Sequence, residues 1–175
     1  MEFFERNIRS CRWGLLLAVF TIFCGFALGG VFGANEAALK GQLKSDGQAV
    51  LSSVYKGDQK KMDKTVSKSW SYLKRAHLHA GAIGAAVVGL LLLLAFLPTN
   101  AVFKLIISWM LGLGTLGYSL FWLLAGFSAP AIGGTHEAKE ALEWLAIPSA
   151  GMLLIGTLAV FLLLLSACFT RKRYY

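Results

Sequence analysis

Four long runs without a charged residue constrain this chain more than any other feature. They cover residues 13–35, 80–103, 105–135 and 144–170. A helix of about 20 residues crosses a hydrocarbon core of roughly 30 Å, so each run is long enough to span a membrane. Because lipid offers the backbone no hydrogen-bond partners, such segments must be helical. The runs therefore predict an all-α, integral membrane four-helix bundle.

Composition and the positions of the prolines support this prediction and refine its boundaries. Charged residues make up 15% of the chain and the mean hydropathy is +0.63, whereas soluble domains carry about 25% charged residues. The turn-forming sequence Pro98-Thr99-Asn100 separates the second and third runs. Pro148 lies near the start of the fourth, where a missing backbone N–H costs least. We expect residues 1–175 to form a single membrane domain, with spans near 13–34, 78–97, 101–125 and 146–169.

The basic charge is explained by the membrane. The net charge is +8, and residues 36–75 alone hold nine Lys or Arg against four acids. Basic residues beside spans meet anionic lipid headgroups, so a lipid bilayer is the expected partner and nucleic acid is not. Four spans place both termini on one side. Arg6, Arg9 and Arg12 precede the first span and favour a cytoplasmic side for the termini, with the bacterial inner membrane as the location if the source is prokaryotic.

The segment 35–76 is expected to be an extramembrane helical loop. Asp58 can cap a helix that continues into the second span. Apolar positions then recur every three or four residues, which places them on one helix face and leaves most lysines elsewhere; they are Met62, Val66, Trp70, Leu73 and His77. This amphipathic segment either lies on the membrane surface or extends the second span outward as a stalk.

Small residues recur at helical spacing in the spans. Gly25, Gly29 and Gly33 form such a row in the first span, which we expect to contact other membrane subunits or a second copy of the chain. In the second span, Gly81, Ala85 and Gly89 continue the face of His77. The sequence GLGTLG at 112–117 spells G-x-G-x-x-G. A dinucleotide site would need a strand before this motif, so the sequence predicts helix packing instead.

Two histidines mark the start of the second span. His77 and His79 are two positions apart, and on a helix they point about 200° away from each other. Both cannot bind one ion while the helix is intact. His77 continues the small-residue face and should look into the bundle, so we expect His77 rather than His79 to be the ligand.

A second polar cluster precedes the fourth span. Residues 135–147 are expected to form a short interfacial helix that Thr135 caps. His136 and Glu140 are then one turn apart, and Glu143 follows three residues later, so that the three form a polar stripe. A histidine and a carboxylate one turn apart are suited to a divalent metal.

Three alternatives follow for these residues. His77 and His136 are axial ligands of a haem b between helices. Alternatively they hold copper, iron or zinc, together with Glu140 and with His79 or Glu143. In the third alternative no cofactor binds, and the histidines and acids belong to an interfacial, solvated helix face. The stretch RAHLHAGAIG resembles the His-x-His and glycine stretches that carry ligands in core subunits of haem-copper oxidases. The resemblance covers these ten residues of 175 and favours haem.

These alternatives lead to three functions. A haem or metal near one membrane surface implies electron transfer within a larger membrane complex. Without a cofactor, the chain is a non-enzymatic accessory or assembly subunit, and glycine-lined helices also permit a passive channel or small-solute carrier. No span centre contains Asp, Glu, Lys, Arg or His, which argues against a pump or coupled transporter. We do not expect the chain to be an enzyme on its own.

Overall fold

The structure is a computed structural model that describes the backbone of residues 2–169 and the side chains of residue 5 and of residues 7–169. Within this part of the chain all regular structure is helical, which confirms the all-α class. Four of the helices are long and apolar enough to cross a membrane. The elements are α1 (Glu2–Ala34), α2 (Glu36–Ala49), α3 (Gln59–Phe96), α4 (Ala101–Ile132), α5 (Thr135–Ala141) and α6 (Glu143–Phe169).

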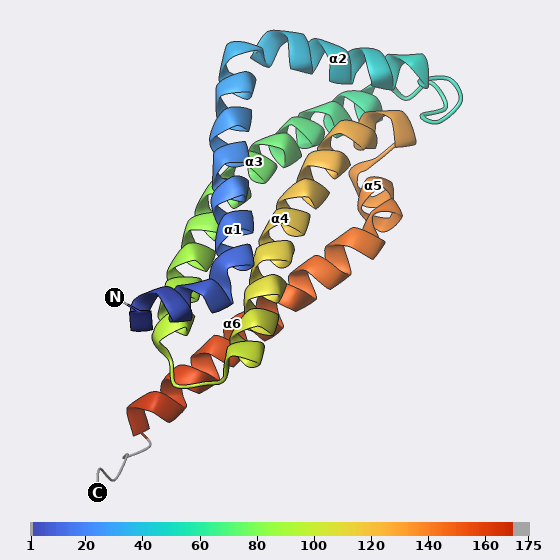
Figure 1. Ribbon diagram of the computed structural model, residues 1–175. Helices are drawn as coiled ribbons and strands as arrows, with labels where there is room; N and C mark the ends of the chain where they lie inside the picture. The colour runs from blue at the N-terminus through green and yellow to red at the C-terminus, as the bar shows by residue number, and fades with distance from the viewer. Residues whose placement is uncertain (1, 170–175) are drawn as a thin grey trace, which may run out of the picture.

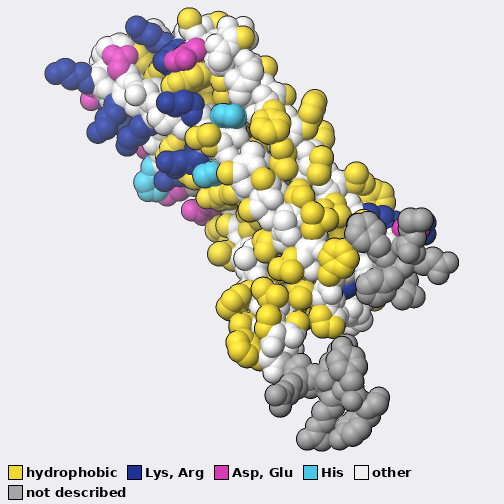
Figure 2. Space-filling model, turned by 90° about the vertical axis from the view of Figure 1, so that its left-hand side faces the viewer, with side chains coloured by type: hydrophobic (Ala, Val, Ile, Leu, Met, Phe, Trp, Pro, Cys, Tyr) yellow, Lys and Arg dark blue, Asp and Glu magenta, His cyan; other side chains and the backbone are white. Residues whose placement is uncertain are grey.

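Three of the long helices pack against one another, and the fourth is placed to one side. Helices α1, α3 and α4 are in mutual contact, whereas α6 packs mainly on α4. The start of α1, the α3–α4 turn and the end of α6 lie at one end of the molecule, and α2 and α5 lie at the other (Figure 1). This is the up-and-down order expected of four spans. Lys and Arg side chains gather at the α2 end, with a broad apolar band below them (Figure 2).

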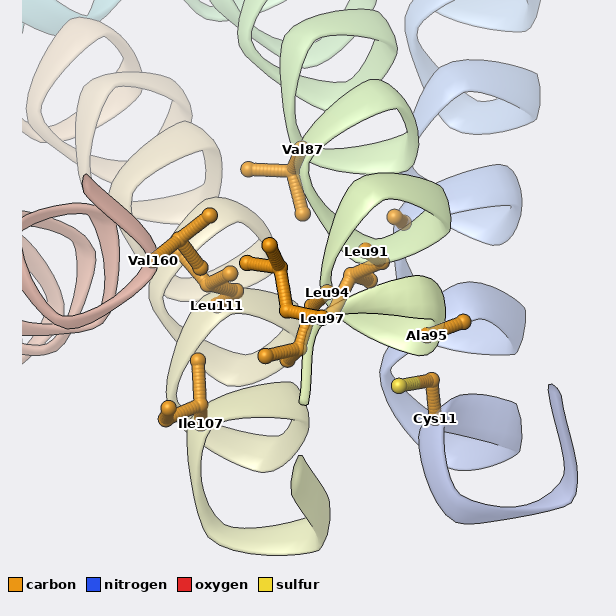
Figure 3. Packing of buried hydrophobic residues seen from close by; sticks show 10 residues of the cluster. Cys11, Val87, Leu91, Leu94, Ala95, Leu97, Ile107, Leu111 and Val160 are labelled. Carbon is orange, nitrogen blue, oxygen red and sulfur yellow. The ribbon is translucent and has the colours of Figure 1, made fainter. Parts of the chain in front are cut away.

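The core lies between α3 and α4. Leu91 and Leu94 of α3 face Ile107 and Leu111 of α4, and Val160 of α6 closes the cluster (Figure 3). Large apolar side chains on the outer faces remain exposed, most of all on α6. Since a bilayer solvates such side chains, this arrangement fits a membrane protein.

Helix α3 is continuous from the extramembrane segment into the membrane. The Asp58 side chain accepts a hydrogen bond from the backbone N–H of Lys61 at 2.9 Å, which confirms the predicted cap. On the predicted amphipathic face, Trp70 and Leu73 are buried against Leu43 of α2. The segment is therefore a stalk that extends the span, and α2 covers its apolar face.

Helix α4 is longer than predicted. The expected span ended at residue 125, but the helix continues to Ile132 and contains Pro130. Gly133 ends it with a left-handed conformation (φ 101°), which glycine adopts without a side-chain penalty. Tyr55, buried in the α2–α3 connection, donates a hydrogen bond to the Pro130 carbonyl at 2.8 Å. Proline has no N–H, so the helix lacks one of its hydrogen bonds here. The hydrogen bond from Tyr55, which belongs to a distant segment, helps to keep this part of the chain helical.

The region before the fourth span also differs from the prediction. The expected single helix over 135–147 is broken at Leu142, so that α5 ends at Ala141 and α6 begins at Glu143. Gly134 occupies the N-cap of α5, and no side chain caps this helix. The prediction that Thr135 caps it is therefore wrong.

The glycines of α1 pack inside the chain. A Cβ placed on Gly25 would lie 2.9 Å from the backbone nitrogen of Gly81, and a Cβ on Gly29 would lie 2.7 Å from the His77 ring. The prediction that Gly25, Gly29 and Gly33 together face another subunit is therefore wrong for the first two, because α3 already occupies them. A Cβ on Gly33 would meet nothing within 4 Å.

The predicted small-residue face of α3 is only partly correct. Gly81 approaches α1, but Ala85 and Gly89 are exposed. The buried stripe passes instead through Ala80, Gly84 and Val87. The crossing with α1 selects this neighbouring face because a Cβ on Gly84 would lie 2.7 Å from Ile22.

The GLGTLG sequence serves packing, as predicted. Gly112 lets α4 approach α1, since a Cβ there would lie 2.9 Å from the Cα of Gly14. Gly114 and Gly117 lie against Ser149 of α6. One short sequence therefore makes close contacts with two different helices, one on each side of α4.

Candidate functional site at the membrane boundary of α3

His77 is held between α3 and α1. Its Nδ1 lies 2.9 Å from the carbonyl oxygen of Gly25, and its ring occupies the space that a side chain on Gly29 would take. A carbonyl can only accept, so Nδ1 carries the proton in this contact. The nitrogen that faces α1 is therefore used by the chain itself.

His79 belongs to a different contact. Its ring stacks on Tyr118 of α4, with centroids 5.5 Å apart and planes at 16°, and meets the edge of Trp122 at 6.1 Å. His77 meets α1 and His79 meets α4, which confirms that the two point to different sides of α3. Together the two histidines join α3 to both of its neighbours.

Around His79 lies an aromatic cluster with one cation. The Arg75 guanidinium lies 4.4 Å from the centroid of the Trp122 ring and 5.6 Å from that of Tyr72. The Trp122 ring also packs edge-on against Tyr72, with centroids 4.9 Å apart. A cation over an indole face contributes about 0.5–2 kcal/mol. The cluster thus fastens α3 to α4 where the polar part of α3 meets its apolar part.

This cluster was not anticipated from the sequence, although its signal is there. Tyr72, Arg75 and His79 recur at spacings of three and four on α3, and Tyr118 and Trp122 are four positions apart on α4. Each row taken alone is an ordinary amphipathic pattern. Only the pairing of the two helices makes them one cluster.

His136 and Glu140 form the predicted pair on α5. The His136 Nδ1 lies 3.5 Å from a carboxylate oxygen of Glu140, and their side chains are 77% and 60% exposed. Glu143 lies beyond the break at Leu142, at the start of α6. The predicted stripe of three therefore does not continue along one helix, and two solvated ligands remain.

The predicted ligands come from separate surfaces. His77 faces α1, whereas α5, which carries His136, contacts α3, α4 and α6 and, over the described residues, has no contact with α1. Among the described side chains, those of residue 5 and of residues 7–169, no group of three or more His, Cys, Asp or Glu lies close enough to hold a metal ion. Haem and metal binding by His77, His79, His136, Glu140 and Glu143 stay predictions from the sequence.

Lys104 is a buried lysine whose contacts could not be foreseen from the sequence. It is the only charged residue between Arg75 and Glu137, and it is 4% exposed. Its Nζ donates to the Ala95 carbonyl at 2.6 Å and to the Asn7 side chain at 3.1 Å. The carbonyls of the last helical turn lack partners within the helix, and a cation there also suits the helix dipole. Lys104 thus ties α1, α3 and α4 together at the end opposite to His77.

Comparisons with protein-family models, with curated proteins and with solved structures find no match to this chain. The fold itself defines the class, which is an all-α integral membrane protein with four apolar helices.

Proposed function

We propose that this protein is a non-catalytic membrane subunit, an accessory or assembly component that acts by binding other membrane components. The observation that carries the proposal is the engagement of its boundary histidines. His77 bonds to the Gly25 carbonyl and His79 stacks on Tyr118. Side chains in these positions support the chain's own helix contacts, which is a structural use of histidine.

The exposed surface of α6, on the side away from α4, supports the same proposal. Of its 27 residues, Ser149, Gly156 and Val160 are buried, and all lie towards α4. The opposite side carries large apolar groups such as Leu154 and Leu158, which are 72% and 54% exposed. A helix that gives so little of its surface to its own chain leaves most of it for lipid or for another membrane helix.

The test compares two positions on α6. A photo-reactive amino acid is introduced at Leu158, on the exposed side, or at Val160, which is 1% exposed and faces α4. We expect irradiation of native membranes to give one discrete heavier adduct from position 158 and none from position 160. The absence of any adduct from position 158, or equal adducts from both positions, would contradict the proposal.

A second measurement addresses the cofactor directly. We expect the purified full-length protein to show no Soret band and less than stoichiometric copper, iron and zinc. A Soret band or a stoichiometric metal that disappears in His77→Ala or His136→Ala would overturn the accessory function and favour electron transfer. For the Soret band His79→Ala serves as the matched control, since His79 is not one of the two predicted haem ligands and its ring is stacked on Tyr118 of α4.

A further inference from the structure

A groove opens between the first turns of α1 and the first turns of α4, at the end of the molecule opposite to α2. Its volume is about 420 Å³. Arg9 and Arg12 of α1 line its polar part, and Val102, Leu105 and Trp109 of α4 line its apolar part together with Trp13. One depression thus changes from cationic to apolar within a few residues.

Among the described side chains, the two arginines have no acidic partner. They lie three positions apart on α1 and both are exposed. Within the described residues, neither guanidinium lies within 4.0 Å of a carboxylate, since the ion pairs are those of Lys40 with Glu36 and of His136 with Glu140. The Arg12 guanidinium lies 5.3 Å from the Trp13 ring centroid. Two adjacent forked donors at a membrane surface are suited to a phosphate group.

Two tryptophans line the groove. The rings of Trp13 and Trp109 are stacked, with centroids 6.2 Å apart and planes at 25°, and they remain 44% and 38% exposed. Tryptophan is enriched where a membrane meets water, because its ring is apolar and its N–H is polar. The arginines directly precede the uncharged run that begins at Trp13, so they lie at the depth of lipid phosphates.

We infer that this α1–α4 groove binds one anionic phospholipid. Its phosphate lies against Arg9 and Arg12, and one acyl chain follows Trp13, Leu105 and Trp109 into the bilayer. A zwitterionic lipid also carries a phosphate, but its own headgroup cation would lie beside the two guanidinium groups. Charge complementarity therefore selects an anionic headgroup. The inference does not depend on the proposed accessory function.

The test uses the full-length protein in detergent and native mass spectrometry. The probes are phosphatidylglycerol and phosphatidylcholine with identical acyl chains. We expect one phosphatidylglycerol per chain to be retained in preference to phosphatidylcholine. In the double variant Arg9→Gln and Arg12→Gln the affinity for phosphatidylglycerol should fall about thirtyfold, since each interfacial cation contributes a factor of about five.

Matched controls separate this site from general charge effects. The double variant Lys60→Gln and Lys64→Gln removes the same charge from exposed positions on the stalk and should leave the preference unchanged. Inorganic phosphate added in excess should not displace the lipid. Equal retention of the two lipids, equal loss in both double variants, or displacement by inorganic phosphate would each overturn the inference. A melting temperature within about 2 °C of wild type, less than 1 kcal/mol for a chain of this size, verifies that each variant is folded.

Discussion

Replacing Lys104 by methionine tests whether a single buried ammonium ties three helices together. Methionine has a similar length and keeps the apolar stem, so the change removes chiefly the charge and the two hydrogen bonds to Ala95 and Asn7. Hydrogen bonds of charged groups each contribute about 1.5–3 kcal/mol. Removing the ammonium also removes the cost of burying it, so we expect a net loss of about 2 kcal/mol. In a chain of this size that corresponds to a melting temperature lower by about 4–8 °C.

Cys11 provides a local probe for this variant. It is fully buried beside α4, and its carbonyl accepts a hydrogen bond from the Ser108 hydroxyl at 3.0 Å. In a background with Cys24→Ser and Cys168→Ser, Cys11 is the only thiol of the chain. A thiol-reactive fluorophore then reports the temperature at which α1 separates from α4. We expect the fluorophore to label Cys11 of the Lys104→Met variant at a lower temperature than Cys11 of the parent, and at a higher rate below the unfolding transition.

The control is Lys60→Met, which removes a lysine from an exposed position in the first turn of α3. It should melt within about 1 °C of the parent, since exposed charges contribute little. If Lys104→Met melts with the parent and Cys11 labels at the same rate, the three-helix tie is refuted.

Two further predictions concern contacts between distant segments. Gly29→Ala should push the His77 ring out of its place and lower the melting temperature by about 3–6 °C through overpacking. Gly30→Ala, where a Cβ meets nothing within 4 Å, should not lower it, since alanine is the better helix former. Equal melting of the two variants would argue against the His77 contact. Tyr55→Phe should cost about 1 kcal/mol, because the Pro130 carbonyl loses its donor. Burial raises the pKa of Tyr55 above its usual 10.0. The protonated phenol therefore stabilises the fold fully below pH 10, and this contribution is lost as the pH rises through the raised pKa. The difference from Tyr55→Phe in a pH series of melting curves should disappear only as the pH rises through the raised pKa, and a difference that disappears below pH 10 would contradict this assignment.

Local features were predictable to the extent that neighbouring residues control them. The cap at Asp58 and the apolar face of the stalk follow from residues within one or two turns, and both are present. The end of α4 was not predictable in this way. Its last turns are rich in small residues and contain Pro130, which locally favour a loop, and the hydrogen bond from Tyr55 comes from 75 positions away.

The candidate site shows the same division. The sequence correctly separated His77 from His79, because helical geometry alone sends them to different sides. It did not reveal that His77 would meet the Gly25 carbonyl, or that His79 would stack on Tyr118. Several faces of α1 and α4 carry glycines or aromatic residues, and their periodicity does not say which face meets α3.

By itself the sequence determined that this is a membrane protein with four long apolar helices, because the cost of exposing backbone polar groups to lipid acts on each segment separately. The tertiary structure alone decided which glycines are covered, which helix stands apart and what the ionisable side chains contact. Helix pairing in lipid depends on close packing between surfaces of similar apolar character. The apolar surfaces of these helices have similar compositions and differ mainly in shape. Which two surfaces fit together is decided only when the helices pack against each other.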